Sequence, residues 1–371
     1  MQIGIPAETI AGETRVAMTP ETVKKLKAQG HVLRVQSGAG VAASVTDAAY
    51  EAAGAEITDA AGALGCELVL KVRSPSESEL AQMKSGSCLV GMLNPFDAQG
   101  LGRLAGAGLT SFALEAAPRT TRAQSMDVLS SQANIAGYKA VMMAADKYQR
   151  FFPMLMTAAG TVKAARVVIL GVGVAGLQAI ATARRIGAMV EAYDVRPETR
   201  EQVESLGAKF VDTGVSAAGE GGYARELTDE EKAKQAEKLA KAVAQCDALI
   251  TTAAIPGREA PKIITAAMVA GMKPGAVVVD MAADSGGNVE GTVKGDKTWI
   301  NDVLVIGPTH IPSRMPVHAS EMYAKNLFNF ISPFIKDGEL TLDWEDEVMA
   351  GCCLTHDGEL RHAGVKHALG L

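Results

Sequence analysis

Three glycines and one aspartate stand out in the segment KAARVVILGVGVAGLQAIATARRIGAMVEAYDVRPETR, residues 163–200. Gly171, Gly173 and Gly176 follow one apolar run, and Asp194 ends a second. In a Gly-x-Gly-x-x-Gly turn, the first glycine allows a tight turn, the second lets a pyrophosphate approach the backbone, and the third lets helix and strand pack closely. The phosphates lie at the helix N-terminus, and an acid about 20 residues on binds the adenosine ribose. The segment therefore predicts a dinucleotide site.

The context of these glycines makes the prediction specific, because glycine is common in this chain, at 38 of 371 residues. The apolar run at 167–170, the turn, a helical segment and Asp194 stand in the order that nucleotide binding requires. The alternatives are an ordinary glycine-rich turn or a membrane span. Gln178 and the pair Arg184-Arg185 argue against a span.

Asp194 also bears on which nucleotide binds. A carboxylate at this position suits a free 2′-hydroxyl and repels a 2′-phosphate. Arg196, two residues later, points toward the phosphorylated nucleotide instead. Because Asp194 at the strand end is expected to contact the ribose more directly than Arg196, we expect NAD(H) rather than NADP(H).

A second polar segment, PRTTRAQSMDVLSSQ at 118–132, contains Arg119, Gln124, Asp127 and Ser130. It lies between the two expected domains, where ligands commonly bind. An arginine, an amide, a carboxylate and a hydroxyl could together hold a nicotinamide carboxamide and its ribose. The alternative is a polar hinge in which Asp127 or Ser130 caps the next helix. The residue types alone leave both interpretations open.

Other polar residues stand near expected strand ends. Arg15, Lys71 and Arg73 could meet an anionic substrate, although lone basic residues more often pair with surface acids. Asp280 ends the apolar run 276–280, so we expect it near the nicotinamide, with a turn cap as the alternative. Reduction of a ketone or imine needs a general acid, usually histidine, yet His31 is the only histidine before residue 310.

The apolar runs alternate with helical patterns in both halves of the chain, which predicts parallel sheets covered on both faces. The expected strands are 2–6, 31–36, 67–72, 88–93, 109–114, 167–170, 189–193, 209–211, 248–251, 276–280 and 303–306. The expected helices include 19–30, 46–53, 76–84, 98–107, 129–150 and 322–331. The prediction is an α/β fold of two doubly wound, Rossmann-like domains with a cleft between them.

We expect the N-terminal domain to cover residues 1–128 and 327–371, with the last forty residues completing it. The nucleotide-binding domain then covers 129–326. Within it, DTGVSAAGEGGYAR lies in a stretch of about 212–226 that is too rich in glycine and small polar residues to build a core. This stretch predicts a mobile surface loop. Thr228 and Glu231 form a capping box for the helix that follows.

The composition excludes several classes of protein. The net charge of −6 and the absence of a basic stripe argue against nucleic-acid binding. The N-terminus lacks the features of a signal peptide, and no stretch has the length and apolarity of a membrane helix, which predicts a cytoplasmic chain. The five cysteines have no C-x-x-C pair, and the six histidines have no metal spacing, so we expect no metal.

Longer motifs add a family resemblance. The motifs are ETRVAMTPETVKKL, SGAGVAASVTDAAYEAAGA, RAQSMDVLSSQANIAGYKAV, MTAAGTVKAARVVILGVGVAGLQAIATARRIGA, YDVR, TTAAIPG and MKPGAVVVDMAADSGGN. Together they resemble the alanine dehydrogenase and proton-translocating transhydrogenase superfamily over nearly the whole chain. Within it, the chain is most similar to the NAD(H)-binding component of the transhydrogenases.

One departure separates the two branches. Alanine dehydrogenases carry a lysine in an L-V-x-K-V motif and a catalytic histidine 21 residues later. Lys71 is present here, but position 92 is Met92. The resemblance implies that Arg119, Gln124, Asp127 and Ser130 hold the nicotinamide, and that Tyr223, after Gly222 in the glycine-rich loop, closes over the nucleotide. It further implies an NAD(H) site lined by Val174, Asp194, Val195, Arg196, Gln235 and Ala254.

The resemblance also implies a reaction without a general acid, because hydride passes directly from the C4 atom of one nicotinamide to the C4 atom of another. NADP(H) and the proton pathway would belong to partner proteins: a membrane beta subunit that binds NADP(H) and a small membrane alpha-2 subunit. The chain would be a homodimer, peripheral on the cytoplasmic face of the inner membrane, AB-specific, and inactive without its partner. Two other functions stay open: an alanine-type amino-acid dehydrogenase and a non-catalytic, NAD-responsive binding module.

Overall fold

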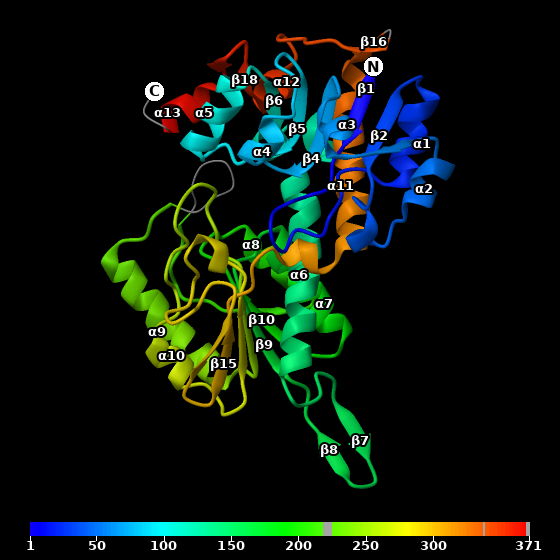
Figure 1. The fold of residues 1–371 in the computed structure, drawn as a ribbon. Helices are drawn as coiled ribbons and strands as arrows, with labels where there is room; N and C mark the ends of the chain where they lie inside the picture. Colours follow the sequence, from blue (N-terminus) through cyan, green and yellow to red (C-terminus); the bar gives the residue numbers. More distant parts are fainter. Residues whose placement is uncertain (218–224, 337, 369–371) are drawn as a thin grey trace. The chain divides into compact units, whose positions relative to one another are not determined.

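The computed structural model describes residues 1–217, 225–336 and 338–368, and the chain divides into two compact units (Figure 1). The first unit comprises Met1–Gln132 and Pro312–Leu371, and the second comprises Ala133–Ile311. The first division falls within helix α6 (Val128–Lys147), close to the expected 128/129 boundary. The expected boundary at 326/327 would cut helix α11 (Pro316–Ile331), which lies wholly in the first unit. The reason is that Tyr323, Leu327 and Phe330 of α11 are buried in the core of that unit.

The first unit contains an eight-stranded sheet in the order β19-β18-β6-β5-β4-β1-β2-β3. Its strands are β1 (Gln2–Ile5), β2 (Val32–Gln36), β3 (Glu56–Thr58), β4 (Leu68–Arg73), β5 (Cys88–Met92), β6 (Thr110–Ala113), β18 (Cys353–His356) and β19 (Glu359–Leu360). The six strands from β3 to β6 are parallel, and the chain order reverses between β1 and β4. Strand β18 pairs antiparallel with β6. The C-terminal segment therefore adds two strands to the sheet of the first unit.

Helices cover both faces of this sheet because successive strand residues point to opposite sides. Leu70 packs in one core with Leu26 and Leu327, whereas Val69 packs in a second core with Leu104. The helices are α1 (Pro20–Ala28), α2 (Asp47–Ala52), α3 (Ala60–Leu64), α4 (Glu77–Leu80), α5 (Ala98–Gly106), α11, α12 (Glu347–Cys352) and α13 (Ala363–Ala368). A small hairpin, β16 (Ile335–Lys336) and β17 (Glu339–Leu340), follows α11.

The second unit contains a seven-stranded sheet in the order β11-β10-β9-β12-β13-β15-β14. Its strands are β9 (Arg166–Leu170), β10 (Met189–Tyr193), β11 (Lys209–Phe210), β12 (Ala248–Thr251), β13 (Val277–Asp280), β14 (Lys297–Ile300) and β15 (Val303–Ile306). All neighbours are parallel except β14, which pairs antiparallel with β15 at the edge. The strand order reverses beside β9, and this is the point at which doubly wound sheets bind nucleotides. The predicted doubly wound α/β architecture is confirmed in both units.

Helices again lie on both faces of the second sheet (Figure 1). They are α6, α7 (Val174–Arg185), α8 (Thr199–Ser205), α9 (Asp229–Gln245) and α10 (Ala266–Ala270). Ile169 packs in one core with Val141 and Ile180, and Val168 packs in the other with Leu239. The predicted capping box is present at the start of α9, where Thr228 accepts a hydrogen bond from the backbone of the third helical residue.

A two-stranded hairpin, β7 (Leu155–Thr157) and β8 (Gly160–Val162), projects from the second unit beyond the end of α6 (Figure 1). All residues of both strands are exposed. We did not expect this hairpin, because neither strand has the alternation of a half-buried strand. No helix in the part of the chain that the structure describes is long and apolar enough to cross a bilayer.

Candidate functional site

The glycine loop connects β9 to α7, and its three glycines differ in their steric surroundings. Gly171 has a φ of +91°, which favours glycine. A Cβ atom at Gly176 would lie 1.9 Å from the carbonyl oxygen of Gly171, so only glycine allows the helix to pack on the loop. Among the described residues, no atom lies within 4 Å of a Cβ atom placed at Gly173. The space at Gly173 is therefore open, as the approach of a pyrophosphate requires.

The first turn of α7 follows this loop. Gly173 is its N-cap and supplies no side chain, and Val174 is the first helical residue, exposed to solvent. The amides of the first turn of a helix lack intrahelical partners and carry a partial positive charge, which makes them donors for a phosphate. Helix α6 packs tightly against this turn, because a Cβ atom at Gly137 would lie 2.2 Å from the carbonyl oxygen of Ala175. Gly137 was missed by the sequence reasoning, although a glycine inside a helix is itself a signal of close packing.

Asp194 lies just beyond the end of β10, next to the glycine loop. Its Oδ2 atom accepts a hydrogen bond from the backbone amide of Val172 at 2.8 Å. The guanidinium group of Arg196 donates to both carboxylate oxygens, through Nε at 2.9 Å and Nη2 at 2.8 Å. Burial opposes ionisation of Asp194, but the hydrogen bonds from Arg196 and Val172 outweigh it and lower the pKa of this carboxyl. The carboxylate therefore joins the loop to the end of β10 while remaining charged.

The other residues predicted for the nucleotide site are spread over the same unit. Val195 is half-buried beside Asp194, and Ala254 is exposed in the loop after β12. Gln235 is buried on α9, where its amide nitrogen donates to the hydroxyl of Tyr193 at 2.9 Å. Tyr193 was not among the predicted residues, and its position at the end of β10, directly before Asp194, is the signal that could have identified it.

Asp280 ends β13, and hydrogen bonds within the second unit occupy its carboxylate. It is fully buried, and its Oδ1 atom accepts hydrogen bonds from Thr251 Oγ1 at 2.9 Å and from the amide of Ala282 at 3.1 Å. Its Oδ2 atom accepts from Thr292 Oγ1 at 2.7 Å and from the amide of Val289 at 3.0 Å. Both oxygens are thus engaged within the protein, which fits the alternative role of holding the turn, and the place near the nicotinamide stays a prediction.

Asn288 adds a second link between the loops after β12 and β13. Its Oδ1 atom accepts from the amide of Ala253 at 3.0 Å, and its Nδ2 atom donates to the carbonyl of Ala253 at 2.7 Å and of Pro261 at 2.9 Å. Asn288 is fully buried. Asp280 and Asn288 together position the loops at the carboxyl edge of the sheet. Asn288 was not predicted as a site residue, although it ends the motif MKPGAVVVDMAADSGGN.

Arg119, Gln124, Asp127 and Ser130 belong to the first unit. Arg119 and Gln124 are exposed, and Gln124 lies in the short helix η3 (Arg122–Met126). Asp127 caps α6: its Oδ1 atom accepts from the amide of Ser130 at 2.9 Å, and its Oδ2 atom accepts from Ser130 Oγ at 2.5 Å. The capping interpretation is therefore correct, and it leaves the nicotinamide role of these side chains as a prediction. Gly222 and Tyr223 lie outside the described residues.

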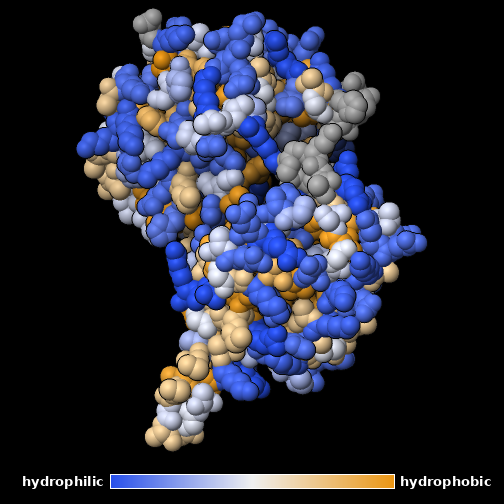
Figure 2. Space-filling view, turned by 180° about the vertical axis from the view of Figure 1, so that it is seen from behind, coloured by the Kyte–Doolittle hydropathy of each residue, from blue (hydrophilic) through white to orange (hydrophobic). Residues whose placement is uncertain are grey.

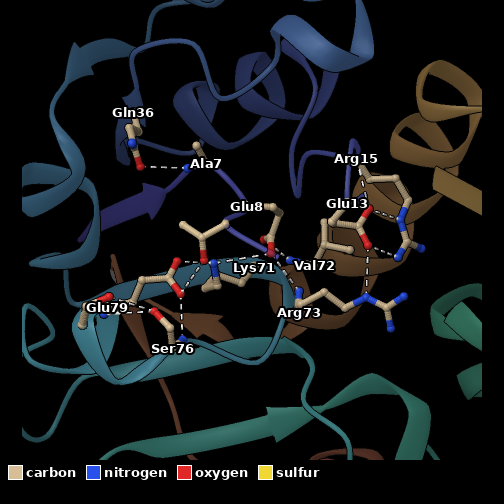
Figure 3. Close-up of polar contacts among 12 residues, drawn as sticks. Ala7, Glu8, Glu13, Arg15, Gln36, Lys71, Val72, Arg73, Ser76 and Glu79 are labelled. Carbon is tan, nitrogen blue, oxygen red and sulfur yellow. Dashed lines mark hydrogen bonds and ion pairs between the residues drawn. The ribbon is translucent and has the colours of Figure 1, made fainter. Parts of the chain in front are cut away.

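The basic residues near the first sheet form a charged cluster with three glutamates (Figure 3). Arg15 donates to Glu13 through Nε at 2.7 Å and through Nη2 at 2.6 Å. Arg73 Nε donates to the same carboxylate at 3.0 Å. The predicted pairing with acids is present, but Arg15 and Glu13 are buried rather than at the surface. Burial opposes ionisation of Glu13, yet Arg15 and Arg73 lower its pKa to about 2.

Lys71 extends this cluster at the carboxyl end of β4. Its Nζ atom donates to Glu79 Oε1 at 2.7 Å and lies 3.4 Å from Glu8 Oε2 (Figure 3). Burial raises the pKa of Glu8, which accepts from the amide of Val72 at 2.7 Å. The cluster lies where the first sheet reverses its strand order, between β1 and β4, and its three cations face three carboxylates of the same unit.

Met92 ends β5, and the partly buried Glu115, which was not among the predicted residues, contacts the backbone two residues later. Glu115 accepts a hydrogen bond from the amide of Asn94 at 2.7 Å through Oε1. Its Oε2 atom is buried and has no hydrogen-bond partner among the described residues. Burial raises the pKa of Glu115 to about 7. The sequence carried no signal for this, because burial of a glutamate at a strand end depends on distant packing.

Two domain families match consecutive parts of the chain. Residues 4–136 match the alanine dehydrogenase/PNT N-terminal domain, and residues 140–363 match the alanine dehydrogenase/PNT C-terminal domain. The chain belongs to the alanine dehydrogenase/PNT family. The resemblance predicted from the sequence motifs is therefore confirmed.

Within this family, the chain is similar to proteins of both branches. It is 47% identical to an NAD(P) transhydrogenase subunit alpha chain of Rhodospirillum rubrum over 376 residues, covering 98% of each chain. It is 30% identical to the alanine dehydrogenase of Mycolicibacterium smegmatis, covering 100% of this chain and 97% of the relative. Identity to the transhydrogenase subunit is thus the higher of the two.

A solved structure of a transhydrogenase from Sinorhizobium meliloti is 47% identical and superimposes with a TM-score of 0.89, covering 97% of this chain and 100% of the other. A solved L-alanine dehydrogenase is 27% identical and superimposes with a TM-score of 0.84, covering 100% and 99%. The alanine dehydrogenase/PNT family thus shares one architecture across both branches. Branch assignment must come from the site residues and not from the fold.

Proposed function

We propose that this chain is the NAD(H)-binding component of a transhydrogenase, which passes hydride from NADH to NADP⁺ held on a partner subunit. The observation that carries the proposal is the geometry of the second unit: an open glycine loop, an uncapped helix N-terminus and Asp194 lie together at the reversal point of the sheet. This arrangement offers a site for a pyrophosphate and for the adenosine ribose.

Met92 supports the transhydrogenase branch over the amino-acid dehydrogenase branch. A thioether can neither donate nor accept a proton at the carbon-bound oxygen or nitrogen of a substrate, whereas ketone or imine reduction requires a general acid. Direct hydride transfer between two nicotinamide C4 atoms moves no proton. The higher identity to transhydrogenase alpha subunits points the same way.

Catalysis in this proposal consists of positioning. The two nicotinamide rings must be held at a near-attack distance, roughly 3–3.5 Å between reacting atoms. Arg119, Gln124, Asp127 and Ser130 would orient the NADH ring, and Tyr223 with its loop would exclude water. Val174, Val195, Gln235 and Ala254 would line the rest of the NAD(H) site.

The proposal includes partners that this chain lacks. NADP(H) and the proton pathway would belong to a membrane beta subunit, with a small membrane alpha-2 subunit beside it, and this chain would attach to the cytoplasmic face of the inner membrane through them.

A homodimer is supported by the hairpin β7–β8. Two-stranded hairpins are marginally stable alone in water, and Leu155, Met156 and Val162 of this one are exposed.

The deciding experiment uses the full chain with and without the NADP-binding component of a transhydrogenase. NADH binding is measured first, by the change in dihydronicotinamide fluorescence. Hydride exchange is then followed with NADPH and a spectrally distinct NAD⁺ analogue, and we expect exchange only in the mixture. Bound NADH without exchange would favour the non-catalytic binding module. NADH oxidation by the isolated chain with pyruvate and ammonia would favour an alanine-type dehydrogenase.

A further inference from the structure

We propose that Arg196 is a latent ligand for a 2′-phosphate, and that Asp194 excludes NADP(H) by holding this arginine rather than by charge alone. The inference rests on the proposed NAD(H) site and concerns what makes that site specific. Arg196 follows Asp194 by two residues, and both lie at the ribose end of the glycine loop.

The acceptor positions of Asp194 are all in use. A carboxylate offers about four lone-pair positions, two on each oxygen. Oδ1 accepts from the amide and the Nε atom of Arg196, each at 2.9 Å. Oδ2 accepts from the amide of Val172 and from Nη2 of Arg196, each at 2.8 Å. A ribose hydroxyl can therefore reach this carboxylate only where the Arg196 guanidinium group releases a position.

The charge of Asp194 is also compensated. The side chain of Asp194 is 8% exposed and that of Arg196 is 19% exposed, so the two form a largely buried ion pair. A carboxylate with a bidentate arginine repels a phosphate less than a free carboxylate does. Arg196 must then contribute to the exclusion of a 2′-phosphate, because its Nε and Nη2 atoms donate to Asp194 instead of to the nucleotide.

A 2′-phosphate is the ligand that an arginine in this place would otherwise take. The planar guanidinium group matches the geometry of phosphate and carboxylate alike, and both bind it through two parallel hydrogen bonds. The same donors thus serve either Asp194 in the protein or a phosphate on the nucleotide. Loss of the Asp194 charge should transfer them to the phosphate.

The test measures dissociation constants of NADH and NADPH for the wild-type full chain and three variants, by fluorescence titration. Asp194→Asn keeps an acceptor for the Val172 amide, so the loop stays attached while the charge is lost. We expect this variant to bind NADPH at least about tenfold more tightly than the wild-type chain, which corresponds to about 1.4 kcal/mol. The double variant Asp194→Asn/Arg196→Gln should lose that gain.

Arg200→Gln in the Asp194→Asn background is the matched control. Arg200 is exposed and pairs with Asp212 rather than with Asp194. Its replacement by glutamine removes one positive charge, as Arg196→Gln does. The gain in NADPH binding should survive this change. Equal NADPH affinity in the Asp194→Asn and Asp194→Asn/Arg196→Gln variants would overturn the inference, as would an Asp194→Asn variant that still binds NADH but gains no NADPH. A wild-type chain that binds no NADH would overturn the proposed function, and the inference with it.

Discussion

Glu115 is the residue whose burial has the clearest consequence for stability. Its pKa of about 7 in the folded chain exceeds the ordinary glutamate value of 4.5, so between these two pH values the folded state holds a proton that the unfolded state has lost. The free energy of unfolding therefore falls as pH rises from about 4.5 to about 7. Above pH 7 the full cost of ionising Glu115 in the folded chain is present. The structural source of this cost is burial of the carboxyl group, whose Oε2 atom has no hydrogen-bond partner within the described part of the chain.

The variant Glu115→Gln should remove the cost, since its amide oxygen can still accept from Asn94. We expect it to exceed the wild-type chain in unfolding free energy at pH 8 by on the order of 1–3 kcal/mol, with the difference shrinking toward pH 5. Urea unfolding at several pH values measures this. Glu51→Gln, at an exposed position, is the control. A difference that does not change with pH would contradict the prediction.

Gly173 and Gly176 offer a matched pair that separates binding from folding. Gly173→Ala adds a methyl group that meets no atom of the described residues within 4 Å, so the melting temperature should hardly change. The same methyl group occupies space that the pyrophosphate needs. Gly176→Ala places a carbon 1.9 Å from a carbonyl oxygen and should destabilise the second unit by about 1–3 kcal/mol. Thermal unfolding and NADH titration test both. Unchanged NADH affinity in Gly173→Ala would show that the phosphates bind elsewhere.

At the scale of elements, α6 begins at a residue with two possible roles. Asp127 caps this helix, and replacing a capping aspartate with alanine costs about 1 kcal/mol, whereas asparagine caps equally well. Asp127→Asn should therefore keep the melting temperature and slow hydride transfer, and Asp127→Ala should lower both. Arg119→Ala, at an exposed position, should slow transfer without loss of stability. If Asp127→Asn transferred hydride at the normal rate, Asp127 would have only the capping role, which would contradict the prediction.

Several elements could be predicted because their signals are local. Strands β9, β10, β12 and β15 follow apolar runs bounded by turns, and α7 follows a glycine loop. Other elements depend on partners far along the chain. Strand β18 is an example, because it pairs with β6, which ends at Ala113, and no local pattern reveals that partner. Helix α11 starts at Pro316, six residues before the expected start, because proline suits the first helical position.

At the scale of the whole molecule, the hairpin β7–β8 leads to a prediction about assembly. Leu155→Ser/Met156→Ser removes apolar surface from an element that is exposed throughout. Figure 2 shows the hairpin, at the bottom of the view, as a mostly hydrophobic projection. We expect the wild-type chain to be a dimer and the variant to dimerise at least about tenfold more weakly, because buried apolar area drives association.

Sedimentation analysis over a range of concentrations measures this dimerisation. Val41→Ser, which changes an exposed apolar residue of the first unit, is the control and should leave dimerisation unchanged. A monomeric wild-type chain, or a hairpin variant that dimerises as tightly as the wild type, would contradict the homodimer.

The sequence by itself determined the dinucleotide motif, the doubly wound α/β class and the family, because glycine spacing, apolar periodicity and long motifs are properties of neighbouring residues. Only the tertiary structure decided which polar side chains are free to meet a ligand. Asp280, Arg15 and Lys71 resembled site residues in the sequence, but each is buried and bonded within its own unit. Asp194 is held by Arg196, and Glu115 lies in a place where it resists ionisation. Burial and hydrogen-bond partners depend on residues far apart in the chain, so no local pattern could reveal them.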